Sequence, residues 1–332
     1  MKAAFKRGSQ VALRDVDLRP PGVDEIRLRV TACGICGTDL HVREGDETES
    51  GFGHEIAGTI LELGPGVQGL EVGQRVVLES ASACGRCANC RNCRQELCTD
   101  IRSFFHLGFM GFAEEMIAPA VCAIPCEDLP PEVGCLSEPL GVAIDMVRLA
   151  DIQLDSNVLL MGAGPIGLMA LAIVRRMGAR RIFYSAYRKQ EVRARLVEQF
   201  GADELIDPTE TPLAERDFGC GIDRVLVTSP PRTLASALRV AVKGGIISYI
   251  GIEWGEGAYC RFEANEFHFK KLQLRASFAS PAMYTPLALQ YLREGVVDGE
   301  ALITHRLPLT EIEQAMQVAR DKRVAAKVVV MP

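Results

Sequence analysis

Two patterns of hydrophobic and polar positions divide the chain. Up to about Ala123, short segments such as 11–18 and 26–30 alternate apolar and polar residues with a period of two. Such alternation is typical of strands that bury one face. Glycine and proline mark turns in this part, for example at 64–66 and 72–73. We therefore predict mostly antiparallel β-structure for this part of the chain.

From about Glu132 onwards, apolar strand-like segments alternate with segments of helical periodicity. The strand-like segments are 158–161, 181–185, 224–227 and 246–250, and the helical ones are 140–149, 168–177, 191–200 and 233–242. This alternation predicts a doubly wound parallel sheet, so the fold class is α/β. In the tail we predict a helix at 286–294, an extended segment at 302–309, and a last helix that begins with a capping box at 310–313.

Length, composition and charge limit the class of protein. A chain of 332 residues favours about two domains. With 48% hydrophobic and 24% charged residues, it is neither disordered nor collagen-like. A net charge of −6 argues against nucleic acid or anionic lipid as a partner. The first residues lack the apolar core of a secretory signal, and glycines interrupt the longest uncharged stretch, 156–174, so we expect a cytoplasmic protein without a membrane segment.

A glycine-rich turn follows one of the predicted strands and opens a predicted helix. The run Gly162-Ala163-Gly164-Pro165-Ile166-Gly167 matches G-x-G-x-x-G in the context that this motif requires. The glycines allow a tight turn, and the backbone can approach a pyrophosphate that lies on the helix N-terminus. The alternative is a strand-to-helix turn that binds nothing. Because strand, motif and helix are in register, we predict a dinucleotide site.

The end of the next predicted strand bears on which dinucleotide binds. An NAD site usually has Asp or Glu about 20 residues after the glycine turn. This sequence has Ser185-Ala186-Tyr187-Arg188-Lys189 there, and no carboxylate before Glu191. Arg188 and Lys189 can bind a 2′-phosphate, although they could also be a solvated helix start. The missing acid and the two bases together favour NADP over NAD.

Five of the twelve cysteines lie between positions 84 and 98. Cys84, Cys87 and Cys90 have C-x2-C-x2-C spacing, and seven residues separate Cys90 from Cys98. In a reducing compartment, grouped cysteines more often bind metal than form disulfides. We therefore predict a structural zinc with a closed shell of four thiolates, the alternative being disulfides or free thiols. Cys93 is a fifth candidate, so spacing alone leaves one ligand ambiguous.

A second set of ligand types is dispersed along the chain. Cys36 lies near the N-terminus, His54 and Glu55 are adjacent, and Glu138 comes much later. One Cys, one His and one or two carboxylates suit an open, catalytic zinc site. Taken singly, each residue also has a structural interpretation: a buried thiol, a core histidine, or a carboxylate at the start of a helix.

Together these segments resemble the zinc-dependent medium-chain alcohol and polyol dehydrogenases, the family that includes alcohol, sorbitol and threonine dehydrogenases. The similar segments run in the family's order along most of the chain: 33–41, 53–55, the cysteine lobe 84–98, 138–140, 162–167 and 302–309. The resemblance implies a GroES-like catalytic domain over 1–135, a Rossmann cofactor domain over 136–276, and a return of 277–332 to the catalytic domain. It also implies a homodimer or a homotetramer.

The resemblance assigns metal-binding roles to individual residues. Cys36 and His54 would bind a catalytic zinc, and Glu55 and Glu138 match positions that serve as ligand or near-ligand. Cys135 could substitute for Glu138. The structural zinc would be held by Cys84, Cys87, Cys90 and Cys98, because the family spacing skips Cys93. Two zinc ions per chain are therefore expected.

Three residues near Cys36 match the family's proton-handling positions. Thr38 matches the hydroxyl of a proton relay, His41 its exit to solvent, and Asp39 the carboxylate that orients the zinc-binding His54. Each of the three could instead make turn hydrogen bonds or lie exposed to solvent.

The function that follows is oxidation of a secondary alcohol of a polyol, sugar or amino-alcohol, or reduction of the ketone. Hydride would pass between a zinc-bound alkoxide and NAD(P). The segments after Cys36 and after Cys98 look shorter than in most relatives, which leaves the substrate open. The alternatives are a zinc-free quinone or enone reductase of the same architecture, a zinc-ribbon nucleic-acid binder, and a catalytically silent, redox-sensing nucleotide-binding protein. The pair Cys36 and His54 argues against the first, and the negative charge against the second.

Overall fold

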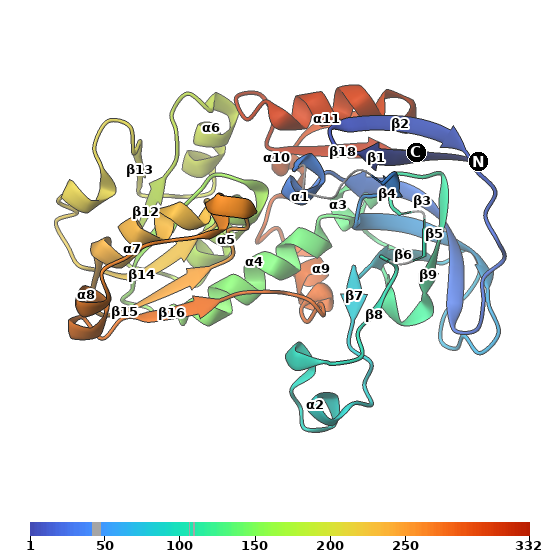
Figure 1. Ribbon diagram of the computed structural model, residues 1–332, viewed down its shortest axis with the longest axis horizontal. Coiled ribbons are helices and arrows are strands. Elements are labelled where there is room, and N and C mark those ends of the chain that lie inside the picture. Colours follow the sequence, from blue (N-terminus) through green and yellow to red (C-terminus); the bar gives the residue numbers. More distant parts are fainter. Residues whose placement is uncertain (42–47, 106, 109) are drawn as a thin grey trace. The chain divides into compact units, whose positions relative to one another are not determined.

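The N-terminal and C-terminal parts of the chain share one structural unit, and the middle of the chain forms another. The structure is a computed structural model that describes all residues except 42–47, 106 and 109. The first unit comprises Met1–Gly141, Ala279–Asp321 and Lys327–Pro332. The second comprises Val142–Phe278 and Lys322–Ala326. Figure 1 shows the two units in a ribbon diagram coloured by position along the sequence.

The first unit is built on two sheets whose strands are mostly antiparallel, which confirms the prediction from the period-two pattern. A seven-stranded sheet has the order β10-β6-β5-β3-β18-β17 with β9 paired to β3, and a three-stranded sheet has the order β2-β1-β4. Strands β17 and β18 pair in parallel. The strands are β1 Lys2–Arg7, β2 Gln10–Asp15, β3 Glu25–Gly34, β4 Ser50–Gly51, β5 Glu55–Leu63, β6 Arg75–Leu78, β7 Ala81–Ser82, β8 Arg102–Ser103, β9 Glu115–Pro119, β10 Ala123–Pro125, β17 Ile303–Pro308 and β18 Lys327–Met331.

Alternation along β3 explains how this unit buries its core. Ile26, Leu28 and Val30 are almost fully buried, and the residues between them are more exposed. The short strands β7 and β8 pair with each other, and the cysteine lobe 84–98 lies between them in the sequence. The lobe therefore begins and ends near a pair of short strands, and its regular structure is one short α-helix, α2 (Ala88–Arg91), and a 3-10 turn.

The helices of the first unit include one corrected prediction. The helix expected at 286–294 is present as α9, but the prediction that a capping box at 310–313 begins the last helix is wrong. A 3-10 turn occupies Leu309–Glu311, so α11 begins at Ile312 and no side chain caps it. Besides α2, the helices of this unit are α1 Gly37–Leu40, α3 Pro131–Gly134, α4 Ser137–Ala150, α9 Thr285–Arg293, α10 Gly299–Leu302 and α11 Ile312–Arg320; α4 continues into the second unit.

The second unit contains the predicted parallel sheet. Its six strands have the order β13-β12-β11-β14-β15-β16, and every pair is parallel. The short edge strands β13 and β16 were not predicted. The elements are β11 Asn157–Met161, α5 Pro165–Arg176, β12 Arg181–Ser185, α6 Glu191–Gln199, β13 Glu204–Ile206, β14 Ile222–Val227, α7 Leu234–Val240, β15 Ala241–Tyr249, α8 Ala264–Phe269 and β16 Gln273–Ala276.

One helix of this unit is shorter than predicted. We expected helix over 233–242, but α7 ends at Val240 and β15 begins at Ala241. Ala241 is already extended, with φ −62° and ψ 133°, and it pairs with Ile222 of β14, and β-branched Val242 also favours a strand.

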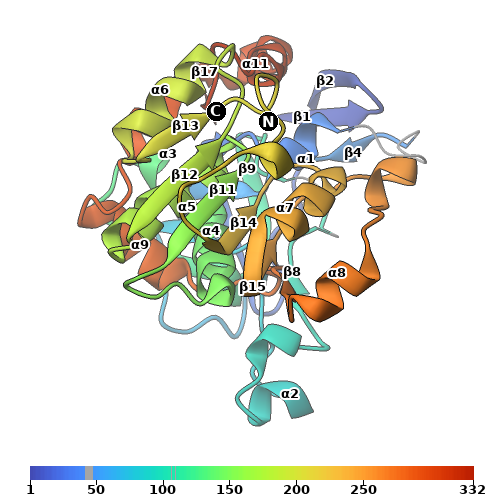
Figure 2. The same ribbon diagram turned by 90° about the vertical axis from the view of Figure 1, so that its left-hand side faces the viewer.

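Helices cover both faces of the parallel sheet (Figure 2). On one face, alternate strand residues such as Leu159, Phe183 and Val225 pack with Leu234 and Leu238 of α7. On the other face, the buried hydroxyl of Ser248 in β15 donates to the carbonyl of Met146 in α4 at 2.8 Å. The glycine turn at the end of β11 therefore lies at the carboxyl edge of a doubly wound sheet, where such folds bind ligands.

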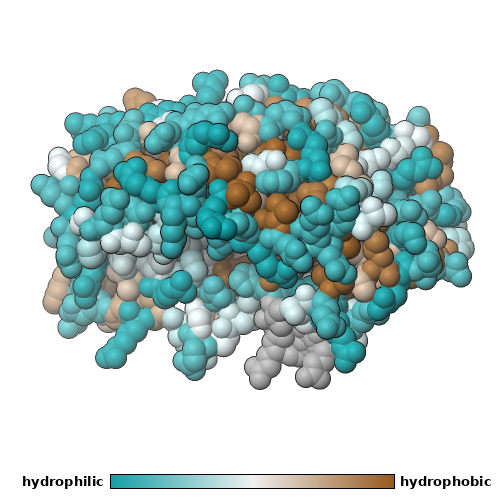
Figure 3. All heavy atoms as spheres, turned by 90° about the horizontal axis from the view of Figure 1, so that it is seen from above, coloured by the Kyte–Doolittle hydropathy of each residue, from teal (hydrophilic) through white to brown (hydrophobic). Residues whose placement is uncertain are grey.

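None of the helices in the described part of the chain is long and apolar enough to cross a membrane. Seen from above, the surface is mainly hydrophilic, and apolar side chains form smaller patches within it (Figure 3).

Candidate functional site

The segment that carries Cys36 leaves the end of β3 and enters the single turn of α1. The Cys36 backbone N–H donates to Oδ2 of Asp39 at 2.8 Å, which closes the first turn of this helix. Oδ1 of the same carboxylate faces Nδ1 of His54 at 3.8 Å. Asp39 is 6% exposed, and it therefore links the Cys36 loop to the imidazole from inside the protein.

Two buried lysines hold the backbone on either side of this segment. Nζ of Lys327, in β18, donates to the carbonyl of Ile35 at 3.1 Å. Nζ of Lys6, in β1, donates to the carbonyl of Asp39 at 2.8 Å and to that of His41. Because each ammonium has three donors, one lysine can bind several carbonyls at once. The loop is thus tied to both sheets of the first unit.

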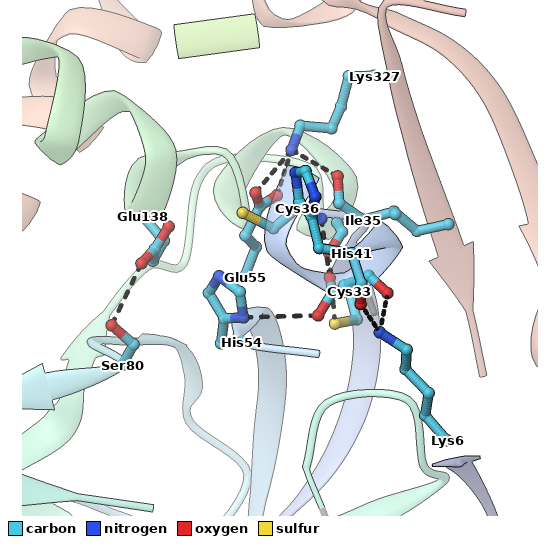
Figure 4. A network of polar contacts seen from close by, with 12 residues as sticks. Lys6, Cys33, Ile35, Cys36, His41, His54, Glu55, Ser80, Glu138 and Lys327 are labelled. Carbon is cyan, nitrogen blue, oxygen red and sulfur yellow. Dashed lines mark hydrogen bonds and ion pairs between the residues drawn. The ribbon is translucent and has the colours of Figure 1, made fainter. Parts of the chain in front are cut away.

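Cys36, His54 and Glu138 are directed toward one another (Figure 4). Cys36 and Glu138 are both close enough to act on the His54 imidazole by their charge. One carboxylate oxygen of Glu138 accepts a hydrogen bond from the buried Ser80 hydroxyl at 3.2 Å. The sulfur, nitrogen and oxygen donors are those of an open zinc site. Their ligand atoms are not all within 4.8 Å of one another, a spacing that only the lobe cysteines reach among the described residues.

The charges around His54 favour its protonated form in the metal-free protein. Burial opposes the charged imidazole, but Cys36, Asp39 and Glu138 together raise the pKa of His54 well above its usual range. Desolvation is also the main cause that raises the pKa of Glu138 and of Asp39. A cation held between the thiol, the imidazole and the carboxylate would satisfy the same concentration of negative charge.

Glu55 forms a buried ion pair with Lys327. Its two carboxylate oxygens accept from Nζ of Lys327 at 2.7 and 2.5 Å, and both side chains are 1% exposed. Burial would lower the pKa of Lys327, but Glu55 and Cys36 raise it above its usual value, so the ammonium stays charged. Glu55 is next to His54 in the sequence, but its carboxylate is engaged elsewhere.

Thr38 and His41, the two other residues predicted for this site, lie on α1 and directly after it. Both are partly exposed, so each can reach water while the neighbouring Asp39 is buried. Residues 42–47, which follow His41 in the segment after Cys36, lie outside the described residues.

The cysteine lobe brings the four predicted sulfurs together. The ligand atoms of Cys84, Cys87, Cys90 and Cys98 all lie within 4.8 Å of one another. The Cys84 and Cys90 sulfurs are 4.0 Å apart, and those of Cys87 and Cys98 are 3.9 Å apart. Four thiolates around one tetrahedral zinc lie about 3.8 Å apart, because each Zn–S bond is about 2.3 Å. The geometry therefore fits zinc.

The pKa values of the lobe thiols also indicate that a bound cation would stabilise the group. Backbone N–H groups lower the pKa of Cys84 and bring the pKa of Cys87 to about 5. Desolvation and the neighbouring thiols raise the pKa of Cys90 to about 12. Four thiolates this close repel one another unless a metal ion neutralises them. Cys93 is exposed and does not belong to the group.

The glycine turn has the strand–turn–helix context that the motif requires. β11 is buried throughout and ends at Met161, and α5 begins at Pro165 with Gly164 as its N-cap. Gly162 has a φ of +109°, in the region that favours glycine. A Cβ on Gly167 would lie 2.2 Å from the Gly162 carbonyl oxygen, so the turn can pack this closely only with glycine there. Gly164, Pro165 and Ile166 are partly exposed and can face a ligand.

The end of β12 carries basic side chains and no carboxylate. Ser185 is buried, whereas Tyr187, Arg188 and Lys189 are exposed, and Nζ of Lys189 lies over the Tyr187 ring at 5.4 Å from its centroid. The Arg188 backbone N–H donates to Oδ2 of Asp207 at 2.8 Å. Its Nη2 donates to the Leu205 carbonyl at 2.9 Å, which leaves the guanidinium half-exposed beside β13.

Several supporting residues were missed by sequence reasoning. Lys6 and Lys327 orient the Cys36 segment, Ser80 holds Glu138, and Asp207 holds the backbone of Arg188. The two lysines had a signal that could have been used. Each occupies an inward position of a strand among apolar residues, where a charge is expensive unless it is paired.

Comparisons with known proteins agree with this geometry. The family model of the alcohol dehydrogenase GroES-like domain matches residues 22–128, and that of the zinc-binding dehydrogenases matches 165–294. L-threonine 3-dehydrogenase of Pyrococcus horikoshii is 32% identical, with 98% of this chain and 96% of that protein covered. Sorbitol dehydrogenase of Arabidopsis thaliana is 31% identical, with 92% and 88% covered. A zinc-binding dehydrogenase of Sinorhizobium meliloti, solved bound to NADP, superimposes with a TM-score of 0.86 at 29% identity, covering 100% and 99% of the two chains.

Proposed function

The chain belongs to the zinc-type medium-chain alcohol and polyol dehydrogenase family, and from this premise we propose that it oxidises a secondary alcohol of a polyol, sugar or amino-alcohol, or reduces the corresponding ketone. The observation that carries the proposal is that the Cys36, His54 and Glu138 side chains are directed toward one another (Figure 4), close enough for Cys36 and Glu138 to act on the His54 imidazole. These are the donors of an open zinc site, in which one position remains for a substrate oxygen.

We assign the catalytic zinc to Cys36, His54 and Glu138. Glu55 is the weaker candidate, because both of its carboxylate oxygens are bound by Lys327. Cys135 fits less well still, because it is fully buried, its thiol donates to the Glu132 carbonyl, and burial raises its pKa. A second, structural zinc is assigned to the four lobe cysteines, which gives two zinc ions per chain.

The protein side of the mechanism is orientation and proton transfer. When bound, zinc supplies a Lewis acid that lowers the pKa of an alcohol, and the nicotinamide accepts the hydride. Asp39 holds the Cys36 backbone and faces Nδ1 of His54, so that the other imidazole nitrogen is free to bind a metal. Thr38 and His41, partly exposed on and after α1, carry the alcohol proton to solvent.

For the hydride carrier we propose NADP in preference to NAD. The turn Gly162, Gly164, Pro165, Ile166 and Gly167 would hold the pyrophosphate at the N-terminus of α5. Ser185, Tyr187, Arg188 and Lys189 would surround the adenosine ribose, where Arg188 and Lys189 attract a 2′-phosphate and the segment 185–190 itself has no carboxylate. The Arg188 guanidinium also lies 3.8 Å from a carboxylate oxygen of Glu210, an exposed pairing that a 2′-phosphate would have to replace. NADP in the similar Sinorhizobium meliloti structure supports the same choice.

We further propose that the protein forms a homodimer or a homotetramer. Strand β16 ends the order of the parallel sheet and pairs only with β15 among the described strands. Its Leu274 is 38% exposed, and Phe278 just beyond it is 74% exposed. A sheet edge with exposed apolar side chains on and beside it can pair with the same edge of a second copy.

The test is a panel of polyols, sugars and amino-alcohols with NADP⁺ or NAD⁺, followed by the absorbance of the reduced cofactor. We expect turnover of at least one secondary alcohol, with a higher kcat/KM for NADP⁺, and loss of turnover when a chelator removes zinc. The alternative is the zinc-free quinone or enone reductase. Reduction of such acceptors by NADPH at full rate in zinc-depleted protein, without any alcohol oxidation, would establish that alternative instead.

A further inference from the structure

The carbonyl of Gly162, the first glycine of the turn, accepts hydrogen bonds from two side-chain hydroxyls. Oη of Tyr184 donates to it at 2.8 Å, and Oγ1 of Thr228 lies 2.9 Å from it. The Thr228 hydroxyl is shared with the preceding carbonyl, that of Met161, which lies farther away at 3.1 Å. Tyr184 is in β12 and Thr228 directly follows β14, and these are the two strands that flank β11. The turn is therefore held from both neighbouring strands at one atom.

These two hydroxyls fill the space beneath the turn. Tyr184 is fully buried, and burial raises its pKa, so its hydroxyl stays protonated and available as a donor. A Cβ on Gly167 would lie 2.7 Å from Oη of Tyr184 and 2.9 Å from Oγ1 of Thr228. A Cβ on Gly162 would lie 2.7 Å from Oγ1 of Thr228. Glycines and hydroxyls thus form one close-packed arrangement.

Fixing this carbonyl also fixes the peptide that follows it. A trans peptide is planar, and its C=O and N–H groups point in opposite directions. Because the Gly162 carbonyl is directed inward to Tyr184 and Thr228, the Ala163 N–H is directed away from them. The orientation of this peptide sets the entry into α5, whose first N–H groups lack intrahelical partners and can bind a phosphate.

We propose that Tyr184 and Thr228 are positioning residues for the dinucleotide: their hydroxyls hold the Gly162 peptide so that the turn is preorganised for a pyrophosphate. They act through the backbone and need not touch the cofactor. The inference rests on the proposed dinucleotide site. Because the pyrophosphate is common to NADP and NAD, the effect should be the same for both cofactors, whichever one the enzyme prefers.

The test compares Tyr184→Phe and Thr228→Val with a matched control, Ser248→Ala. The control also loses a buried hydroxyl that donates to a backbone carbonyl, Met146, on the same sheet but not at the turn. Kd values for NADPH and NADH are measured by calorimetry, together with kcat and the KM for the alcohol at saturating cofactor. We expect each turn variant to weaken both cofactors by about 2- to 10-fold, with kcat and the alcohol KM unchanged.

Two further results complete the design. Thr228→Ser keeps a hydroxyl and should restore most of the affinity lost in Thr228→Val. Ser248→Ala should bind both cofactors with the wild-type Kd. Wild-type Kd values in both turn variants, or an equal loss in Ser248→Ala, would overturn the positioning role. If the wild-type protein itself binds neither cofactor, the dinucleotide assignment fails, and the positioning role fails with it.

Discussion

The two candidate zinc sites differ in how their ligands are brought together. In the lobe, all four cysteines lie within fifteen residues, and their sulfurs are within 4.8 Å of one another. In the other site, Cys36, His54 and Glu138 come from separate elements, and other side chains hold or adjoin them: Asp39 faces His54, and Ser80 binds Glu138. A local cluster depends on its metal for order, whereas a dispersed one depends on the surrounding fold.

The largest effect expected from this difference is on activity. Cys36→Ser should lower kcat/KM by about 10³-fold or more and remove one zinc per chain, because the open site loses its thiolate. The melting temperature should change little, since the sheets that support the loop remain. Metal analysis and steady-state kinetics measure both effects, with Cys260→Ser in the other unit as the control. Full turnover in Cys36→Ser would falsify the catalytic assignment.

The next largest effect is expected at the buried ion pair of Lys327 with Glu55, which lies beside the dispersed site. Lys327→Met leaves the Glu55 carboxylate buried without its partner, and we expect the free energy of unfolding to fall by about 3–5 kcal/mol. Glu55→Gln combined with Lys327→Met should cost much less than the sum of the two single changes. Urea denaturation of the four proteins gives the coupling. Additive costs would show that the pair does not act as a unit.

Removal of one lobe ligand tests the local zinc site, as Cys36→Ser tests the dispersed one. Cys90→Ser should also remove one zinc per chain, but here the result is unfolding of 84–98, because the lobe has little core of its own. Proteolytic cleavage within the lobe should increase, while kcat/KM falls far less than in Cys36→Ser. An intact, protease-resistant lobe without zinc would contradict the role given to the metal.

A smaller effect is expected when the support of His54 is weakened. Asp39→Asn keeps the shape of the side chain but loses the charge that faces His54, and we expect a loss of about 10- to 100-fold in zinc affinity or kcat/KM. Zinc competition with a chelator measures the affinity of this site. The affinity of the lobe should be unchanged, and an equal loss at both sites would indicate a general disturbance.

The smallest effect is expected at the fifth cysteine of the lobe. Cys93 is exposed and lies outside the group of four sulfurs, so Cys93→Ser should change the stability by less than about 0.5 kcal/mol. Zinc content should also stay at the wild-type value. Loss of the lobe zinc in this variant would mean that Cys93 replaces one of the four assigned ligands.

Local sequence patterns predicted most of the fold. The alternation at 26–30 identified β3, and the apolar run at 158–161 identified β11. In both cases the burial of the strand's own side chains leaves a pattern that can be read without knowing the strand's neighbours. The missed strands β13 and β16 are three and four residues long at the sheet edges, where burial leaves little pattern. The end of α7 was missed because pairing of β15 with β14 decides where the strand begins.

The sequence by itself determined the lobe, the glycine turn and the basic end of β12, since each is a short run in which spacing fixes geometry. Only the tertiary structure decided that Glu55 is bound to Lys327, 272 residues away, and that Glu138 is left facing Cys36 and His54. The same holds for Tyr184 and Thr228 beneath the turn. A buried polar group must find a partner, and the partner is chosen by which strands the sheets place side by side, which no local pattern records.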